Sequence, residues 1–150
     1  MKKFFILILL ISFGMSGMQE MVLNALQALR EISFSGHIVI VIPAGAENTA
    51  QAQAEALARG ASVRIFYDVE DMANLMAEAD LAIGGGGTMS WERCAMGLPA
   101  LVVMLGDNQV LGTEALSRLG AIWKVVPSKI DQVPLQIKLK EILNNYSLIR

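Results

Sequence analysis

The sequence has 150 residues, enough for about one domain, and it is apolar, with 54% hydrophobic and 17% charged residues. This composition excludes a disordered chain and predicts a sizeable core. Twelve Lys and Arg against fourteen Asp and Glu give a net charge of −2, which disfavours nucleic acid as the main partner. One cysteine and one histidine exclude an internal disulfide and a Cys/His zinc cluster, so we expect no metal site and a cytoplasmic location.

Near the start of the sequence, Lys2 and Lys3 precede an apolar run, 4–13, and together they resemble a secretory signal. A buried parallel strand is the alternative, and we favour it because no small-x-small cleavage site follows and the run ends at a glycine-containing turn. The run is well short of the roughly 20 residues that a membrane-spanning helix needs. We therefore expect no stable membrane insertion.

Apolar runs and amphipathic segments alternate along the rest of the chain. The predicted strands are 37–42, 61–67, 80–83, 100–105 and 121–126, and the predicted helices are 19–32, 47–59, 72–79, 89–96, 108–119 and one that begins near 131 or 134. Near-continuous apolar strands are typical of a parallel sheet that is buried on both faces. The sequence thus predicts one α/β domain over 1–150, a Rossmann-like three-layer sandwich around a six-stranded parallel sheet.

Two glycine-containing loops, 14–17 and 84–88, follow the first and fourth predicted strands. Ligands of such sheets bind beside the carboxyl ends of these strands, and a small-residue turn before a helix leaves backbone N–H groups for a phosphate. The glycines would also serve a tight turn alone, but four in a row favour close approach to a ligand. Neither loop has the lysine of a nucleotide-hydrolysing P-loop or the spacing of a dinucleotide site, so we expect no cofactor.

Glu92 comes one helical turn after Thr88, roughly 5 to 6 Å along the helix axis. At that distance its carboxylate can accept hydrogen bonds from both hydroxyls of a ribose whose phosphates lie on the loop. The alternative, equally compatible with the spacing, is an exposed glutamate that pairs with an arginine on the helix surface.

The segment ADLAIGGGGTMSWERCAMGLPALVV, residues 79–103, resembles the C-terminal domain of the UDP-sugar hydrolases of pseudaminic acid biosynthesis, which are grouped with spore-coat polysaccharide biosynthesis proteins. It is more distantly similar to the peptidoglycan UDP-N-acetylglucosamine transferase. The segments ILLISFGMSG, DMANLMAEAD and Asp107-Asn108-Gln109 extend the resemblance in the same order. The resemblance implies the C-terminal half of a glycosyltransferase B-type fold, which holds the UDP part of a UDP-sugar.

Site residues follow from the resemblance by position. The resemblance implies that Gly86, Gly87 and Thr88 contact the diphosphate, and the expected substrate-binding residues also include Gly85 and, in the first loop, Gly14 and Ser16. Glu92 would hold the ribose, the backbone at Ile65 and Phe66 would face uracil, and Asn108 and Gln109 would face the sugar or its phosphate.

Three positions depart from the family pattern: Met15 and Gly17 in the first loop, and Met89, where serine or threonine is usual. The resemblance implies an N-terminal domain that carries the family's catalytic histidine, and we expect these 150 residues not to include it. His37 at the start of a strand is no substitute, so the catalytic residues are unknown. We expect the UDP-sugar-binding half of a hydrolase that is inactive alone and works with a separate half or by self-association. The alternatives are the donor half of a glycosyltransferase and a non-catalytic module that binds UDP or a UDP-sugar.

Overall fold

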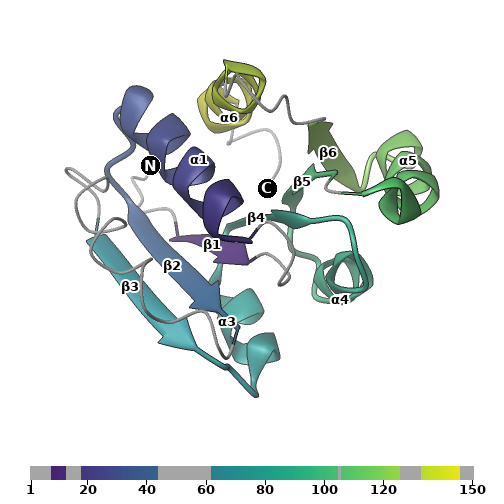
Figure 1. The fold of residues 1–150 in the computed structure, drawn as a ribbon, viewed down its shortest axis with the longest axis horizontal. Helices are drawn as coiled ribbons and strands as arrows, with labels where there is room; N and C mark the ends of the chain where they lie inside the picture. The colour runs from purple at the N-terminus through teal and green to yellow at the C-terminus, as the bar shows by residue number, and fades with distance from the viewer. Residues whose placement is uncertain (1–7, 13–17, 44–61, 105, 126–132, 146–150) are drawn as a thin grey trace.

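Six parallel strands form one sheet in the order β3-β2-β1-β4-β5-β6 (Figure 1). The computed structural model describes residues 8–12, 18–43, 62–104, 106–125 and 133–145. The strands are β1 (Ile8–Ser12), β2 (His37–Ile42), β3 (Ser62–Tyr67), β4 (Leu81–Gly85), β5 (Ala100–Val103) and β6 (Ile122–Val125). The helices are α1 (Met18–Glu31), α3 (Met72–Glu78), α4 (Met89–Ala95), the 3₁₀ helix η1 (Asp107–Gln109), α5 (Val110–Arg118) and α6 (Val133–Asn144).

β1 is a central strand, paired with β2 on one side and β4 on the other. Ile11 is opposite Ile40 in β2 and Ile83 in β4, and all three side chains are fully buried. The described part of the N-terminal apolar run is therefore a strand of the sheet, as the missing cleavage site indicated.

Helices cover both faces of the sheet and complete the predicted three layers (Figure 1). On one face, α1 and α6 pack against each other and bury Leu26, Leu29 and Leu139 against the strands. On the other face, Met76 of α3 and Leu116 of α5 pack against alternate residues of the same strands. Within the described residues, no helix is long and apolar enough to cross a membrane.

The predicted boundaries differ from the structure most at β4, which was expected to end at Ile83. It continues through Gly84 and Gly85, because Gly84 pairs with Ser12 of β1 and with Val102 of β5. Pairing on both sides outweighs the weak strand propensity of glycine. The glycine loop therefore begins at Gly86. The helix predicted over 47–59 lies outside the described residues.

Candidate functional site

The chain reverses its direction of strand addition between β1 and β4, and this is the place where parallel α/β sheets bind ligands. From β1 the chain adds β2 and β3 on one side, and then β4, β5 and β6 on the other. Ser12 ends β1 opposite Gly84, and Gly85 ends β4 one residue further on. The carboxyl ends of these two strands define the candidate site.

Polar groups that are buried in this molecule gather at the same edge. In the described part of the chain, the buried polar or charged side chains are those of Ser12, Ser90, Arg93 and Thr113. Ser12 ends β1, Ser90 and Arg93 belong to α4, and Thr113 packs against Gly86. Because buried polar groups are rare and cost stability when they lack partners, their clustering marks a functional site better than a glycine run does.

Arg93 is the most unusual of these residues, since its side chain is 2% exposed. Its guanidinium donates to the carbonyl of Gly85 (3.0 Å) and to the carbonyl of Ser12 (3.4 Å), so it joins the ends of β4 and β1. No carboxylate among the described residues forms an ion pair with it. Burial lowers the pKa of Arg93 to about 10, with a partial offset from Cys94 and Glu92, and the group is still a cation at neutral pH.

Gly84 makes room for this guanidinium. A Cβ atom at Gly84 would lie 2.1 Å from Nη2 of Arg93 and 2.4 Å from the carbonyl oxygen of Ser12. A glycine is therefore needed at this position for packing inside the protein, which is a different reason from the close approach of a ligand that the glycine run suggested.

Arg93 was not predicted as a site residue from the sequence, because α4 buries polar residues and exposes an apolar one, the reverse of what hydropathy predicts. Trp91 is 58% exposed, while Ser90 and Arg93, three positions apart, face inward. The spacing of Ser90 and Arg93 was the available signal, since residues three apart share a helix face.

Gly86 contacts residues of η1 and α5, the two helices that follow β5. Its N–H donates to Oε1 of Gln109 (3.1 Å), and a Cβ atom here would lie 2.5 Å from Oγ1 of Thr113. The hydroxyls of Thr113 and Ser90 are buried and have no hydrogen-bond partner among the described residues. The structure thus brings Gly86 and Gln109 together, as two of the predicted site residues.

Gly87 and Thr88 form the exposed tip of the loop. A Cβ atom at Gly87 would meet nothing within 4 Å, and Thr88 makes no capping hydrogen bond to α4 through its side chain. In the described structure, the N–H groups of these two residues donate to no protein group. Glu92 is exposed one turn further along α4 and forms no ion pair within the described ranges. These groups are accessible to a ligand.

A family model described as the glycosyltransferase family 28 C-terminal domain matches residues 6–148. The chain belongs to this family. The UDP-N-acetylglucosamine–N-acetylmuramyl-(pentapeptide) pyrophosphoryl-undecaprenol N-acetylglucosamine transferase of Methylococcus capsulatus is 33% identical over 81 residues, which are 51% of this chain and 23% of the relative.

Solved structures share the fold of this family 28 domain. The MurG protein of Acinetobacter baumannii superposes with a TM-score of 0.85 at 22% identity, over 99% of this chain and 44% of that one. The UDP-GlcNAc 2-epimerase of Neisseria meningitidis, solved with UDP-GlcNAc bound, has a TM-score of 0.67 at 14% identity, over 95% of this chain and 37% of that one. The chain thus spans less than half the length of each relative.

Met89 departs from the serine or threonine that the resemblance led us to expect, and the structure shows what it does. The Ser12 hydroxyl donates to Sδ of Met89 (3.6 Å), a weak hydrogen bond that links the start of α4 to the end of β1. In this family 28 domain the Met89 thioether therefore helps to hold α4 against the end of β1.

The remaining predicted site residues are Gly14, Ser16, Ile65, Phe66 and Asn108. Gly14 and Ser16 are outside the described residues. Ile65 and Phe66 are half-buried inside β3, within the strand predicted over 61–67. β3 is the third strand from β4, about 14 Å away at the usual strand spacing. Asn108 is exposed in η1. The uracil assignment stays a prediction, and it requires a ligand that extends across β1 and β2.

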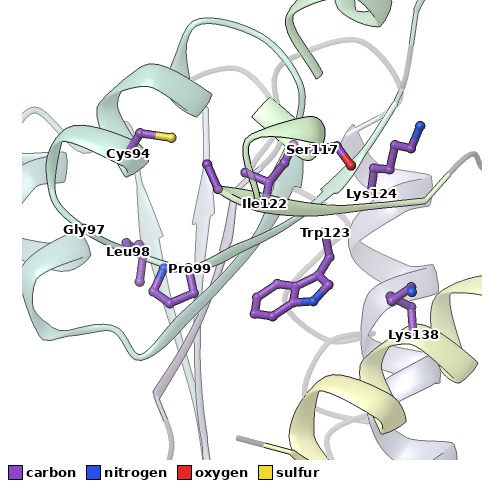
Figure 2. A pocket seen from close by; sticks show the side chains of 11 residues that line it. Cys94, Gly97, Leu98, Pro99, Ser117, Ile122, Trp123, Lys124 and Lys138 are labelled. Atoms are coloured by element: carbon purple, nitrogen blue, oxygen red, sulfur yellow. The ribbon is translucent and has the colours of Figure 1, made fainter. Parts of the chain in front are cut away.

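A cavity of about 830 Å³ lies away from this site, at the amino ends of β5 and β6 (Figure 2). Its lining side chains include Cys94 of α4, Trp123 of β6 and Lys138 of α6. None of the four buried polar side chains described above lines this cavity, although Cys94, the residue after Arg93, does. This cavity therefore lies at the opposite edge of the sheet from the candidate site.

Proposed function

We propose that this family 28 domain binds the UDP part of a UDP-sugar at the carboxyl ends of β1 and β4, as the donor-binding half of a glycosyltransferase. The observation that carries the proposal is the buried cluster around Arg93, which joins the two strand ends next to an exposed loop. The N–H groups of Gly87 and Thr88 in this loop donate to none of the described residues. In this proposal, Gly87 and Thr88 donate backbone hydrogen bonds to the diphosphate. Glu92 accepts hydrogen bonds from the ribose hydroxyls.

The charges near the loop suit a leaving diphosphate. When the bond between the anomeric carbon and the β-phosphate oxygen breaks, negative charge develops on UDP, and the Arg93 cation and the loop N–H groups stabilise it. We place the sugar or its phosphate near Asn108, which is exposed in η1 next to Gln109, the residue that accepts a hydrogen bond from the Gly86 N–H.

The family match and the transferase relative support transfer over hydrolysis. The resemblance to the UDP-sugar hydrolases of pseudaminic acid biosynthesis leaves hydrolysis as the second activity, in which water would replace the acceptor. For either reaction, a catalytic base is still needed: His37 begins β2 at the amino edge of the sheet, opposite the site. We therefore propose that a second domain or partner chain supplies the catalytic and acceptor-binding groups.

Calorimetric titration of UDP, UMP and ADP tests this function. We expect UDP to bind more tightly than UMP, since UMP lacks the second phosphate, and ADP to bind more weakly because its base differs. Glu92→Ala should weaken UDP binding roughly tenfold or more, by the loss of hydrogen bonds to a charged group. Glu31→Ala, an exposed glutamate at the far end of α1, is the matched control and should leave binding unchanged. If wild-type protein binds no uridine nucleotide, the proposal is wrong.

Incubation with UDP-N-acetylglucosamine in water then separates the two activities. We expect no release of UDP from the isolated chain. Release that depends on Glu92 would favour the hydrolase.

A further inference from the structure

One peptide unit of the glycine loop is held at both ends by side chains. The carbonyl of Gly85 accepts a hydrogen bond from Nη1 of Arg93 (3.0 Å), and the N–H of the next residue, Gly86, donates to Oε1 of Gln109 (3.1 Å). The carbonyl and the N–H belong to the same peptide plane. Arg93 comes from α4 and Gln109 from η1, so two separate elements hold this plane.

A peptide between two glycines is the one that most needs such support. Glycine reaches backbone conformations that other residues avoid, so a Gly-Gly peptide rotates more easily than any other. The next two residues, Gly87 and Thr88, carry the exposed N–H groups of the loop tip. The orientation of the Gly85–Gly86 peptide therefore sets where those N–H groups point.

The two supporting side chains are themselves held in place. Arg93 is confined by the Ser12 carbonyl and by the space that Gly84 leaves. On the other side, Oε1 and Cβ of Gln109 lie 3.2 and 3.3 Å from where a Cβ atom of Gly86 would be. A side chain at Gly84 would meet Arg93, and one at Gly86 would meet Gln109.

We propose that Arg93 and Gln109 are positioning residues that clamp the Gly85–Gly86 peptide and so preset the N–H groups of Gly87 and Thr88 for a diphosphate. This inference rests on the proposed UDP binding. It assigns Gln109 to the loop instead of to the sugar, and it takes the Gly86 N–H out of the set that contacts the ligand. Both assignments differ from those that the family resemblance implied.

NMR titrations with UDP, UDP-N-acetylglucosamine and uridine test the clamp. Gln109→Met removes the acceptor oxygen and keeps the length of the side chain. We expect it to weaken UDP and UDP-N-acetylglucosamine by the same factor, roughly two- to tenfold for one hydrogen bond, and to leave uridine unchanged. Leu111→Ser, at a residue that is 85% exposed on α5, is the control and should bind all three ligands as wild type does.

Arg93→Lys tests the second side of the clamp, because lysine keeps the positive charge but loses the two-pronged geometry. We expect Arg93→Lys to weaken binding of the two diphosphate ligands and to leave uridine binding unchanged. In the double variant with Gln109→Met, the loss of binding free energy should be measurably smaller than the sum of the two single losses. Fully additive losses would overturn the idea that both residues act on one peptide.

Three outcomes overturn the clamp while the proposed function stands: unchanged UDP binding in Gln109→Met, a loss for UDP-N-acetylglucosamine alone, which would indicate a sugar contact, or an equal loss for uridine. Failure of the wild-type protein to bind UDP would instead reject the proposed function. If the variants do not fold, amide hydrogen exchange in the wild-type protein decides. UDP should protect the Gly87 amide and leave the Gly86 amide as protected as before, whereas exposure or a new ligand contact of the Gly86 amide would refute the clamp.

Discussion

Replacing Gly84 by alanine should destabilise the domain strongly, while the same change at Gly87 should not. At Gly84 the new methyl group would lie 2.1 Å from Nη2 of Arg93 and 2.4 Å from the backbone carbonyl of Ser12. The carbonyl belongs to the neighbouring strand β1 and cannot retreat without disturbing the strand pairing. The guanidinium would have to leave its position and give up its bonds to Ser12 and Gly85.

The size of the effect follows from two contributions. Overpacking a tight interior costs about 1–3 kcal/mol. Each hydrogen bond to a charged group contributes about 1.5–3 kcal/mol. Since the arginine can keep part of its bonding by shifting, we expect a loss of about 3 kcal/mol in the free energy of unfolding, which lowers Tm by about 10 °C in a domain of this size.

Urea and thermal unfolding, followed by circular dichroism, check this prediction on wild type, Gly84→Ala and Gly87→Ala. A Cβ atom at Gly87 meets nothing within 4 Å, so that variant should stay within about 0.5 kcal/mol of wild type. Equal stabilities of the two alanine variants would refute the view that Arg93 fills the space beside Gly84.

Three further substitutions test other parts of the structure. Thr113→Val should raise the free energy of unfolding by about 1 kcal/mol in urea, because it removes a buried hydroxyl without a partner in the described residues; a loss instead would reveal a bond to that hydroxyl. The hydrogen bond from Lys124 lowers the pKa of Glu114, so its stabilisation is present above the ordinary carboxyl pKa and is lost as the pH falls through the lowered one. In urea unfolding, wild type should therefore have a higher free energy of unfolding than Glu114→Gln at pH 7, and the difference should disappear at pH 2. Trp91→Ser should change stability by less than about 0.5 kcal/mol, since this side chain is exposed; a larger thermal shift would mean that it packs.

The sheet was predictable because its strands are apolar on both faces. The run His37–Ile42 has no polar interruption after its first residue, and the structure buries its last three residues completely or nearly so. Such a β-branched run is typical of a parallel strand that is covered by helices on both sides. The alternation of strands and helices then defined the fold class without any knowledge of long-range contacts.

The interior of the site was not predictable in this way. Hydropathy places an arginine at the surface and a tryptophan in the core, whereas α4 exposes Trp91 and buries Arg93. The burial of Arg93 depends on a missing side chain at Gly84 and on the carbonyl of Ser12, which is 81 residues away in the chain. Gly84 and Gly85 belong to β4 for the same non-local reason, since only their neighbouring strands keep them extended.

The central place of β1 has a consequence for how this chain is made. Ile8 is synthesised well before its partner, since its N–H donates to the carboxylate of Asp80, 72 residues later. At usual rates of translation the partner follows about 4 to 14 s behind. During that interval β1 and β2 can pair, but the other edge of β1 stays open and apolar, which is the kind of edge that joins other chains. A nascent chain of this protein should thus be most prone to aggregation just before β4 is complete.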